Sequence, residues 1–188
     1  MGKTVTSVKR ALSILELFLD NVRSLSVPEI IARLDLPRTT AHDLVQTLLS
    51  NGYLERLDSD SHRYVLGVRV FELGGIYTSR LDITEEARKV ARKISDTCDE
   101  TVQVAILEGA DVVFIIRVDS SQTLRLVSAV GSRLPAHLTA VGKMLLAELS
   151  DKELDALYKG QTTLATMTPN SIGTVDKLIT ELKETRER

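Results

Sequence analysis

Apolar residues recur every three or four positions over the first fifty residues and predict three consecutive amphipathic helices. The first is expected over residues 7–19, where the apolar stripe is wide. Such a stripe either packs against two surfaces, the neighbouring helices and a second subunit, or belongs to a plain core helix. The third helix is expected over about residues 38–50. Its apolar stripe consists of Ala41, Leu44, Val45, Leu48 and Leu49.

Local signals fix the ends of the second and third helices. The second starts at Ser26, because a Ser followed three residues later by Glu29 forms a capping box, and Pro28 is tolerated in a first turn. The run Asp35-Leu36-Pro37 ends it, and Asn51-Gly52 ends the third helix, because such residues readily adopt positive φ.

A hairpin and one further helix follow. Residues 53–57 and 62–66 are expected to be strands joined by the polar turn 58–61. Residues 68–80 are expected to be a helix weakened by Gly74-Gly75, each glycine costing about 1 kcal/mol relative to alanine. This helix is a candidate linker between domains, although packing against a close neighbour would also explain the glycines.

The pattern changes at Asp82, which can cap a helix with Ala87, Val90, Ala91 and Ile94 on its buried side. Strand-like runs over 101–107, 112–118 and 123–130 have short connections, which favour antiparallel neighbours. Helices over 140–149, 150–158 and 174–188, with an extended segment over 160–168, complete an α+β domain. An open sheet this small leaves apolar edges, so further strands are expected to be missing from the sequence or supplied in another way.

Length and charge narrow the classes of function. At roughly 100–200 residues per domain, 188 residues form one domain or two small ones. The 24 Lys and Arg against 26 Asp and Glu count against nucleic-acid binding on bulk charge. Residues 1–67 hold eight basic and eight acidic side chains, so a DNA-facing field must come from their local placement and from helix N-termini.

Other features of the composition argue against secretion and catalysis. The one cysteine, Cys98, allows no internal disulfide, which fits a reducing cytosol. There is neither a signal-peptide run nor a stretch of the roughly 20 apolar residues that span a bilayer, so we expect a cytoplasmic protein with no membrane partner. No nucleophile, metal-ligand or phosphate-loop pattern occurs, so no catalytic residue, metal, cofactor or enzymatic activity is expected.

The order helix, short turn, polar-faced helix and hairpin is typical of a winged helix-turn-helix, whose second helix enters the DNA major groove. The alternative is a small helical subdomain whose polar face meets water. The N-terminal end of a helix favours phosphate through its free amides and its dipole. The candidate DNA contacts are Arg38, Thr39, Thr40, His42 and Gln46 on the helix and Arg63 on the hairpin.

These candidates have different expected roles. Gln46 could reach a base edge, whereas Arg63 and His62 could touch phosphate or the minor groove from the wing. Thr40 could instead only form a hydrogen bond within its own helix turn.

The predicted domain boundaries are 1–67 for the DNA-binding domain, 68–81 for the linker helix and 82–188 for a second, partial domain.

Several short segments share the pattern of a known family. They are SVKRAL at 7–12, LPRTTA at 36–41, GYL at 52–54, YVLG at 64–67 and, most specific, GSRLPAH at 131–137 followed by TAVGK at 139–143. Through these segments the chain resembles the IclR family of bacterial transcription regulators over nearly its whole length.

The resemblance implies a winged helix-turn-helix, a linker helix and a GAF-like effector domain that binds a small metabolite. The family's effector domain usually runs further, so the resemblance implies that this one is incomplete at its C-terminal end. It also implies homodimers formed partly through the DNA-binding domains and often paired into tetramers, and a double-stranded DNA operator as partner. The expected function is a ligand-responsive transcription regulator, a repressor of a metabolic operon. The alternatives are a metabolite-sensing signalling module whose winged domain contacts protein, and a small enzyme.

The resemblance also implies that the ligand borders the segment around the helix start at residue 140. Physically, the helix N-terminus near Thr139 could hold a carboxylate. The alternative is that residues 135–137 form an ordinary turn and Val141 belongs to the core, and for His137 we favour a loop-fixing hydrogen bond. The effector-binding candidates are Leu134, Ala136, His137, Ala140 and Val141.

Asp43 departs from the family pattern, in which this position often carries Arg. A carboxylate accepts a hydrogen bond from cytosine but repels phosphate. Either the operator differs at this position, or Asp43 points away from DNA.

Overall fold

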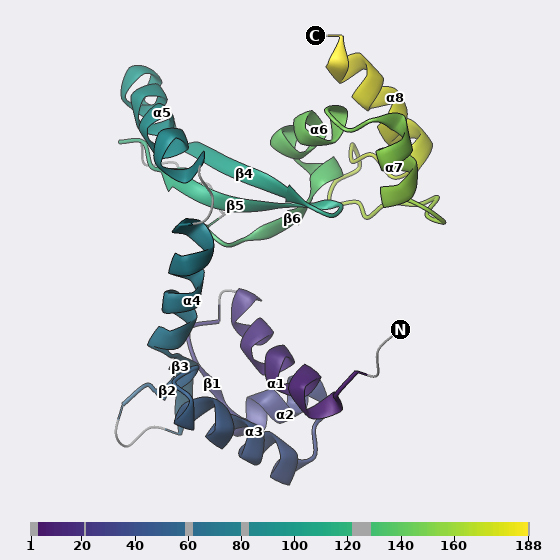
Figure 1. Cartoon of the computed structure of the whole chain (residues 1–188). Helices are drawn as coiled ribbons and strands as arrows, with labels where there is room; N and C mark the ends of the chain where they lie inside the picture. The colour runs from purple at the N-terminus through teal and green to yellow at the C-terminus, as the bar shows by residue number, and fades with distance from the viewer. Residues whose placement is uncertain (1–3, 21, 59–61, 80–82, 122–128, 188) are drawn as a thin grey trace. The chain divides into compact units, whose positions relative to one another are not determined.

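The computed structural model describes residues 4–20, 22–58, 62–79, 83–121 and 129–187. It divides into two compact units, Met1–Leu81 and Asp82–Arg188. Figure 1 shows the first unit in purple to dark teal and the second in teal to yellow. Each unit has its own apolar core, so each is described by itself.

Three helices form most of the first unit (Figure 1): α1 (Thr6–Glu16), extended by a 3-10 turn η1 (Leu17–Asp20), α2 (Val27–Leu34) and α3 (Arg38–Ser50). All three lie close to the predicted positions. The capping box of α2 is confirmed, with Ser26 and Glu29 bonded reciprocally. The buried residues of this core are Ile14, Phe18, Leu25, Ile30, Leu36, Ala41, Val45, Leu48, Leu54 and Tyr64.

Only part of the wide stripe of α1 is buried within the unit. Ile14 is fully buried, whereas Val8 and Leu12 are 56% and 54% exposed. Among the described residues of this unit, α1 therefore buries one side of its stripe and leaves about half of the surface of Val8 and Leu12 exposed.

A small antiparallel sheet with the strand order β1-β3-β2 completes this unit. The predicted hairpin is confirmed as β2 (Leu54–Arg56) and β3 (Arg63–Leu66), and residues 59–61 of its turn lie outside the described residues. β1 (Leu25–Ser26) was not predicted, because two residues directly before a capped helix carry no strand pattern of their own.

The helix α4 (Val68–Ser79) follows the wing and has no buried residue. A Cβ atom added at Gly74 or Gly75 would meet no heavy atom within 4 Å among the described residues. Packing against a close neighbour in this unit therefore does not explain the two glycines.

The second unit contains α5 (Ile83–Cys98) and an antiparallel sheet of β4 (Val102–Glu108), β5 (Asp111–Val118) and β6 (Arg133–Pro135), in that order. The helix α5 contacts β4 and β5 through small residues such as Ala91 and Ser95. Val90 and Ile94, predicted to be buried, are 55% and 47% exposed, because they lie beside that contact face.

Three helices lie beyond the sheet in Figure 1: α6 (Ala140–Ala147), α7 (Asp151–Leu157) and α8 (Val175–Arg186). The predicted capping box of Ser150 and Glu153 is present at α7. These helices and the β5–β6 region share the second core. Its buried residues are Val112, Phe114, Ala136, Leu146, Ala147, Leu154, Tyr158, Leu178 and Leu182.

The strands of this unit agree only partly with the prediction. The third strand predicted over 123–130 lies mostly outside the described residues, as does the Asp82 cap. The strand β6 was not predicted, because its three residues include Pro135 and follow Gly131-Ser132, which indicate a turn. The segment predicted to be extended over 160–168 forms a single bridge, Thr163 to Thr174, and no strand within the part described.

Candidate nucleic-acid interface and effector region

The helix α3 has one buried and one exposed face. Ala41, Val45 and Leu48 point into the core of the first unit. Because buried positions recur every three or four residues, the intervening polar residues share the opposite face. That exposed face carries Arg38, Thr39, His42, Asp43 and Gln46, with Thr40 half-buried at its edge.

The N-terminus of α3 has no side-chain cap. Its N-cap residue is Pro37, and no side chain bonds to the amides of the first turn. By contrast, Ser26 caps α2, the helix that precedes it in the fold. Uncapped first-turn amides and the helix dipole form a site for an anion such as phosphate.

A groove of about 860 Å³ runs beside this helix start. Arg38, Thr39 and His42 line one side, and His62 of the wing also lines it. The apolar part of the lining comes from α2 and β3, whose apolar residues carry no sequence signal that links them with the site. These additional lining residues are Val27, Pro28, Ile31 and Tyr64.

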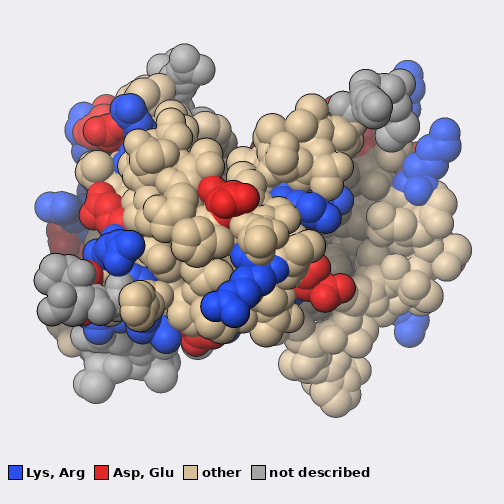
Figure 2. Space-filling view, turned by 90° about the horizontal axis from the view of Figure 1, so that it is seen from below, with Lys and Arg blue, Asp and Glu red and all other residues tan. Residues whose placement is uncertain are grey.

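Charge on the molecule is mixed in sign. Figure 2 shows Lys and Arg dispersed among Asp, Glu and uncharged residues on the face it presents. This agrees with the equal counts of basic and acidic residues over 1–67. An interaction with DNA therefore depends on individual side chains and helix amides rather than on a broad basic patch.

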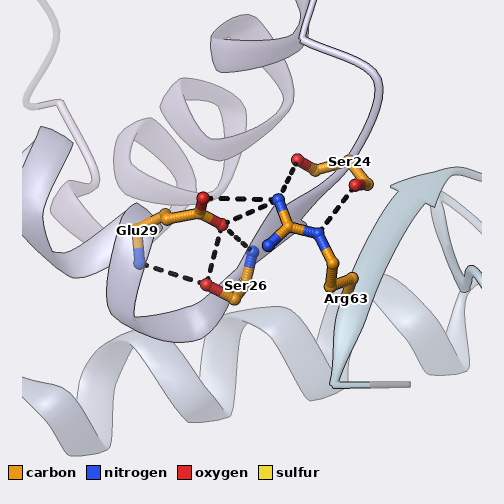
Figure 3. Close-up of polar contacts among 4 residues, drawn as sticks. All are labelled: Ser24, Ser26, Glu29 and Arg63. Atoms are coloured by element: carbon orange, nitrogen blue, oxygen red, sulfur yellow. Dashed lines mark hydrogen bonds and ion pairs between the residues drawn. The ribbon is translucent and has the colours of Figure 1, made fainter. Parts of the chain in front are cut away.

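Arg63 lies in a polar network inside the first unit (Figure 3). Its Nε donates to Ser24 Oγ and its Nη2 to the Ser24 carbonyl, both at 2.9 Å. The same Nη2 lies 3.1 Å from Glu29 Oε2. The network ties β3 to the start of α2, so the guanidinium has partners other than a phosphate.

Glu29 is the acceptor at the centre of this network. The Ser26 backbone amide and hydroxyl each donate to its Oε2 at 2.7 Å. These bonds, with a smaller contribution from Arg63, lower the pKa of Glu29 from 4.5 to about 2. The ionised carboxylate therefore stabilises the folded state above pH 4.5, and this contribution is lost as the pH falls toward 2.

We expect the stability difference between the wild type and a Glu29→Gln variant to depend on pH. The wild type should be the more stable near neutral pH, and its advantage should shrink between pH 4.5 and about 2, where the native carboxylate becomes protonated. Urea unfolding of both proteins across this range measures the difference. If the difference in the free energy of unfolding stays constant from pH 7 to pH 2, the lowered pKa of Glu29 is contradicted.

The effector candidates are brought together in one segment of the second unit. Leu134 belongs to β6 and pairs with Val112, and Ala136 is fully buried. Ala140 and Val141 start α6, whose first turn is capped by the hydroxyl of Thr139, which accepts from the Gly142 amide at 2.9 Å.

His137 fixes a distant loop. It is 6% exposed, and its Nε2 lies 2.8 Å from the Ala165 carbonyl oxygen, to which it donates because a carbonyl only accepts. This is the loop-fixing role favoured for it.

A small pocket of about 230 Å³ lies beside this segment. His137 and Ala140 line it, whereas Leu134, Ala136 and Val141 do not. Leu138, Thr139 and Lys143 of the same segment also line it, and the remaining wall comes from the loop before α8, which no sequence signal had connected with the site. Those loop residues are Thr168, Asn170, Ser171 and Ile172.

Within the described ranges, no three His, Cys, Asp or Glu side chains come together as potential metal ligands. No helix in the part of the chain that the structure describes has the length and apolar character needed to cross a membrane.

Two protein-family models match the chain. The IclR helix-turn-helix domain matches residues 7–58. The family described as bacterial transcriptional regulator IclR C-terminal matches residues 75–188.

Individual relatives agree with these matches. The HTH-type transcriptional regulator XynR of Escherichia coli (strain K12) is 33% identical over 184 residues, which are 98% of this chain and 72% of XynR. The HTH-type transcriptional repressor AllR of the same strain is 31% identical over 185 residues, 98% of this chain and 68% of AllR.

A solved structure is also similar, that of an IclR homolog from Microbacterium hydrocarbonoxydans complexed with 4-hydroxybenzoate. Its TM-score is 0.79 at 26% identity, and the match covers 97% of this chain and 74% of that one. The α+β fold with an N-terminal helix-turn-helix and a C-terminal antiparallel sheet is therefore shared. The chain belongs to the IclR family of bacterial transcriptional regulators.

Proposed function

We propose that this protein is a ligand-responsive repressor that binds an operator through its first unit and a small metabolite through its second. The observation that carries the proposal is the exposed polar face of α3, whose uncapped N-terminus opens onto the groove beside the wing. Relatives that are named regulators and repressors support the same function. Metabolic control is the expected context.

In this proposal α3 lies in the major groove of double-stranded DNA. Arg38, Thr39 and Thr40 contact phosphate together with the first-turn amides, because the helix start is where an anion is favoured. His42 and Gln46 reach toward the bases from the same exposed face.

We assign Arg63 chiefly to positioning the wing. Its guanidinium is bonded to Ser24 and Glu29, so a direct phosphate contact would compete with these partners. Arg63 then supports DNA binding by holding β3 against α2.

The protein should also recognise its effector near the start of α6. The relative complexed with 4-hydroxybenzoate supports a small carboxylate as the ligand class. Titration with aliphatic and aromatic carboxylates, followed by thermal unfolding, tests this assignment. Failure of every carboxylate to raise the unfolding temperature or change operator affinity would contradict it.

Homodimers, alone or as dimers of dimers, are the proposed assembly. A shallow groove of about 410 Å³ on α1 is lined by Val5, Val8 and Leu12, all of which are exposed. Phe71 on α4 is 79% exposed, so both helices present apolar surface that a second copy would cover. Sedimentation over a range of concentrations measures the assembly, and a monomer throughout would contradict it.

Binding of the effector is proposed to change the arrangement of the two DNA-binding units through α4. Coupling between two such sites amounts to about 1–3 kcal/mol in typical allosteric proteins. The operator affinity should therefore change about fivefold to a hundredfold at saturating effector.

A direct test is to titrate the protein with the DNA upstream of its own gene at several salt concentrations. We expect the affinity to fall steeply with salt and to exceed that for random sequence, because phosphate contacts release counterions. A shallow salt dependence without sequence preference would instead favour a signalling module whose winged unit contacts protein. The neutral charge of residues 1–67 is the observation that keeps that alternative open.

A further inference from the structure

Asp43 faces the same side of α3 as the proposed DNA contacts. It is exposed, it follows His42 on the polar face, and it lines the groove together with Arg38. The neighbouring position Ala41 is buried on the opposite face. A side chain in this place does not point away from a DNA duplex bound to α3, so its carboxylate has to be accommodated there.

The carboxylate of Asp43 has no cation to neutralise it among the described residues. None of their ion pairs involves it. The Thr47 hydroxyl donates to the backbone carbonyl of Asp43, at 2.8 Å, and not to its carboxylate. A carboxylate of this kind on a DNA-binding face repels phosphate and needs a hydrogen-bond donor instead.

The major groove offers an amino donor on cytosine, at N4, and on adenine, at N6, but adenine places the acceptor N7 beside its amino group and so disfavours a carboxylate. The N4 amino group of cytosine donates to Asp or Glu, whereas guanine presents only acceptors at the N7 and O6 positions. Asp43 follows Arg38 by five residues, which is about 7.5 Å along the helix axis at about 1.5 Å per residue. Arg38 can therefore contact the backbone while Asp43 reaches a base edge.

We propose that Asp43 is a specificity-determining residue, which accepts a hydrogen bond from the N4 amino group of a cytosine in each operator half-site. This inference rests on the proposed DNA-binding function of α3. The carboxylate contributes selectivity twice, because it accepts from cytosine and repels guanine, whose acceptor atoms occupy the same groove edge.

The test is a selection of bound duplexes from a random-sequence pool, using the full chain and three variants. The wild type should enrich a motif with cytosine at one position of each half-site, preferred roughly fivefold to a hundredfold over other bases. Asp43→Ala should abolish the preference for cytosine at that position and leave the rest of the motif unchanged. Asp43→Asn should move it to adenine, because an amide pairs with adenine N6 and N7.

The matched control is Asp20→Asn, which removes the same charge from an exposed residue of η1. It should enrich the wild-type motif, so that a general effect of charge is separated from base reading. If wild type, Asp43→Ala and Asp43→Asn all enrich one identical motif, Asp43 does not read a base and the inference is overturned while the DNA-binding function stands. If the wild type enriches no motif, the proposed function itself fails.

Discussion

Replacing Arg38 by alanine is expected to weaken operator binding about tenfold to a hundredfold, with the fold and the oligomeric state unchanged. Arg38 is the first residue of α3, is exposed, and has no ion-pair partner among the described residues. Its guanidinium is therefore free to contact phosphate, and a charge-assisted hydrogen bond contributes about 1.5–3 kcal/mol. The salt dependence should also become shallower, by a slope of about 1.

The measurement is operator affinity at several salt concentrations, with sedimentation as the test of assembly. Arg92→Ala is the matched control, because Arg92 is exposed on α5 together with Arg88, Lys89 and Lys93, and we expect this basic face to meet only solvent. Its removal should leave the affinity unchanged. A variant pair with the opposite behaviour, weak binding by Arg92→Ala and normal binding by Arg38→Ala, would move the DNA surface from α3 to α5.

Replacing Gly142 by alanine is expected to destabilise the second unit by about 2–3 kcal/mol. Gly142 is buried in the first turn of α6, and a Cβ atom there would lie 2.2 Å from the Ala136 carbonyl oxygen and 2.6 Å from the Ala136 Cα atom. Both are backbone atoms of the turn that precedes the helix, so the clash is relieved only if this turn moves. In an unconstrained helix the same change would stabilise by about 1 kcal/mol, so the close approach decides the sign.

Gly75→Ala is the control for Gly142→Ala. The chemical change is identical and also lies in a helix, but a Cβ atom at Gly75 meets nothing within 4 Å among the described residues. Gly75→Ala should therefore stabilise α4 by up to about 1 kcal/mol. Urea unfolding of the full chain followed by circular dichroism measures both variants, and equal effects of the same sign would contradict the packing argument.

Features set by neighbouring residues could be predicted from the sequence. The capping boxes of Ser26 with Glu29 and of Ser150 with Glu153 join residues three apart, and both are present as expected. The exposed face of α3 also follows from spacing, because its buried residues recur at helical intervals. These local patterns were sufficient to predict the winged helix-turn-helix and most helices of the second unit.

Contacts between distant residues could not be predicted in this way. Arg63 bonds to Ser24 across 39 positions and His137 to Ala165 across 28, and neither pair has a pattern that links its members. The apolar stripe of α1 likewise indicated a wide contact face without showing that Ile14 would be buried and Leu12 exposed. Hydrophobicity alone identifies surfaces that need a partner but not which partner each one meets.

The absence of buried side chains on α4, among the described residues, affects how effector binding could be transmitted through this helix. A 12-residue helix without a buried side chain gains no cooperativity from its own unit, and isolated helices of this length are marginal in water. Its amides should exchange with deuterium sooner than those of α3 in a monomer and become protected on assembly. In that case, effector binding in the second unit would reach the DNA-binding unit as a change in how much of α4 is helical. It would not be transmitted as a rigid-body motion of an intact helix.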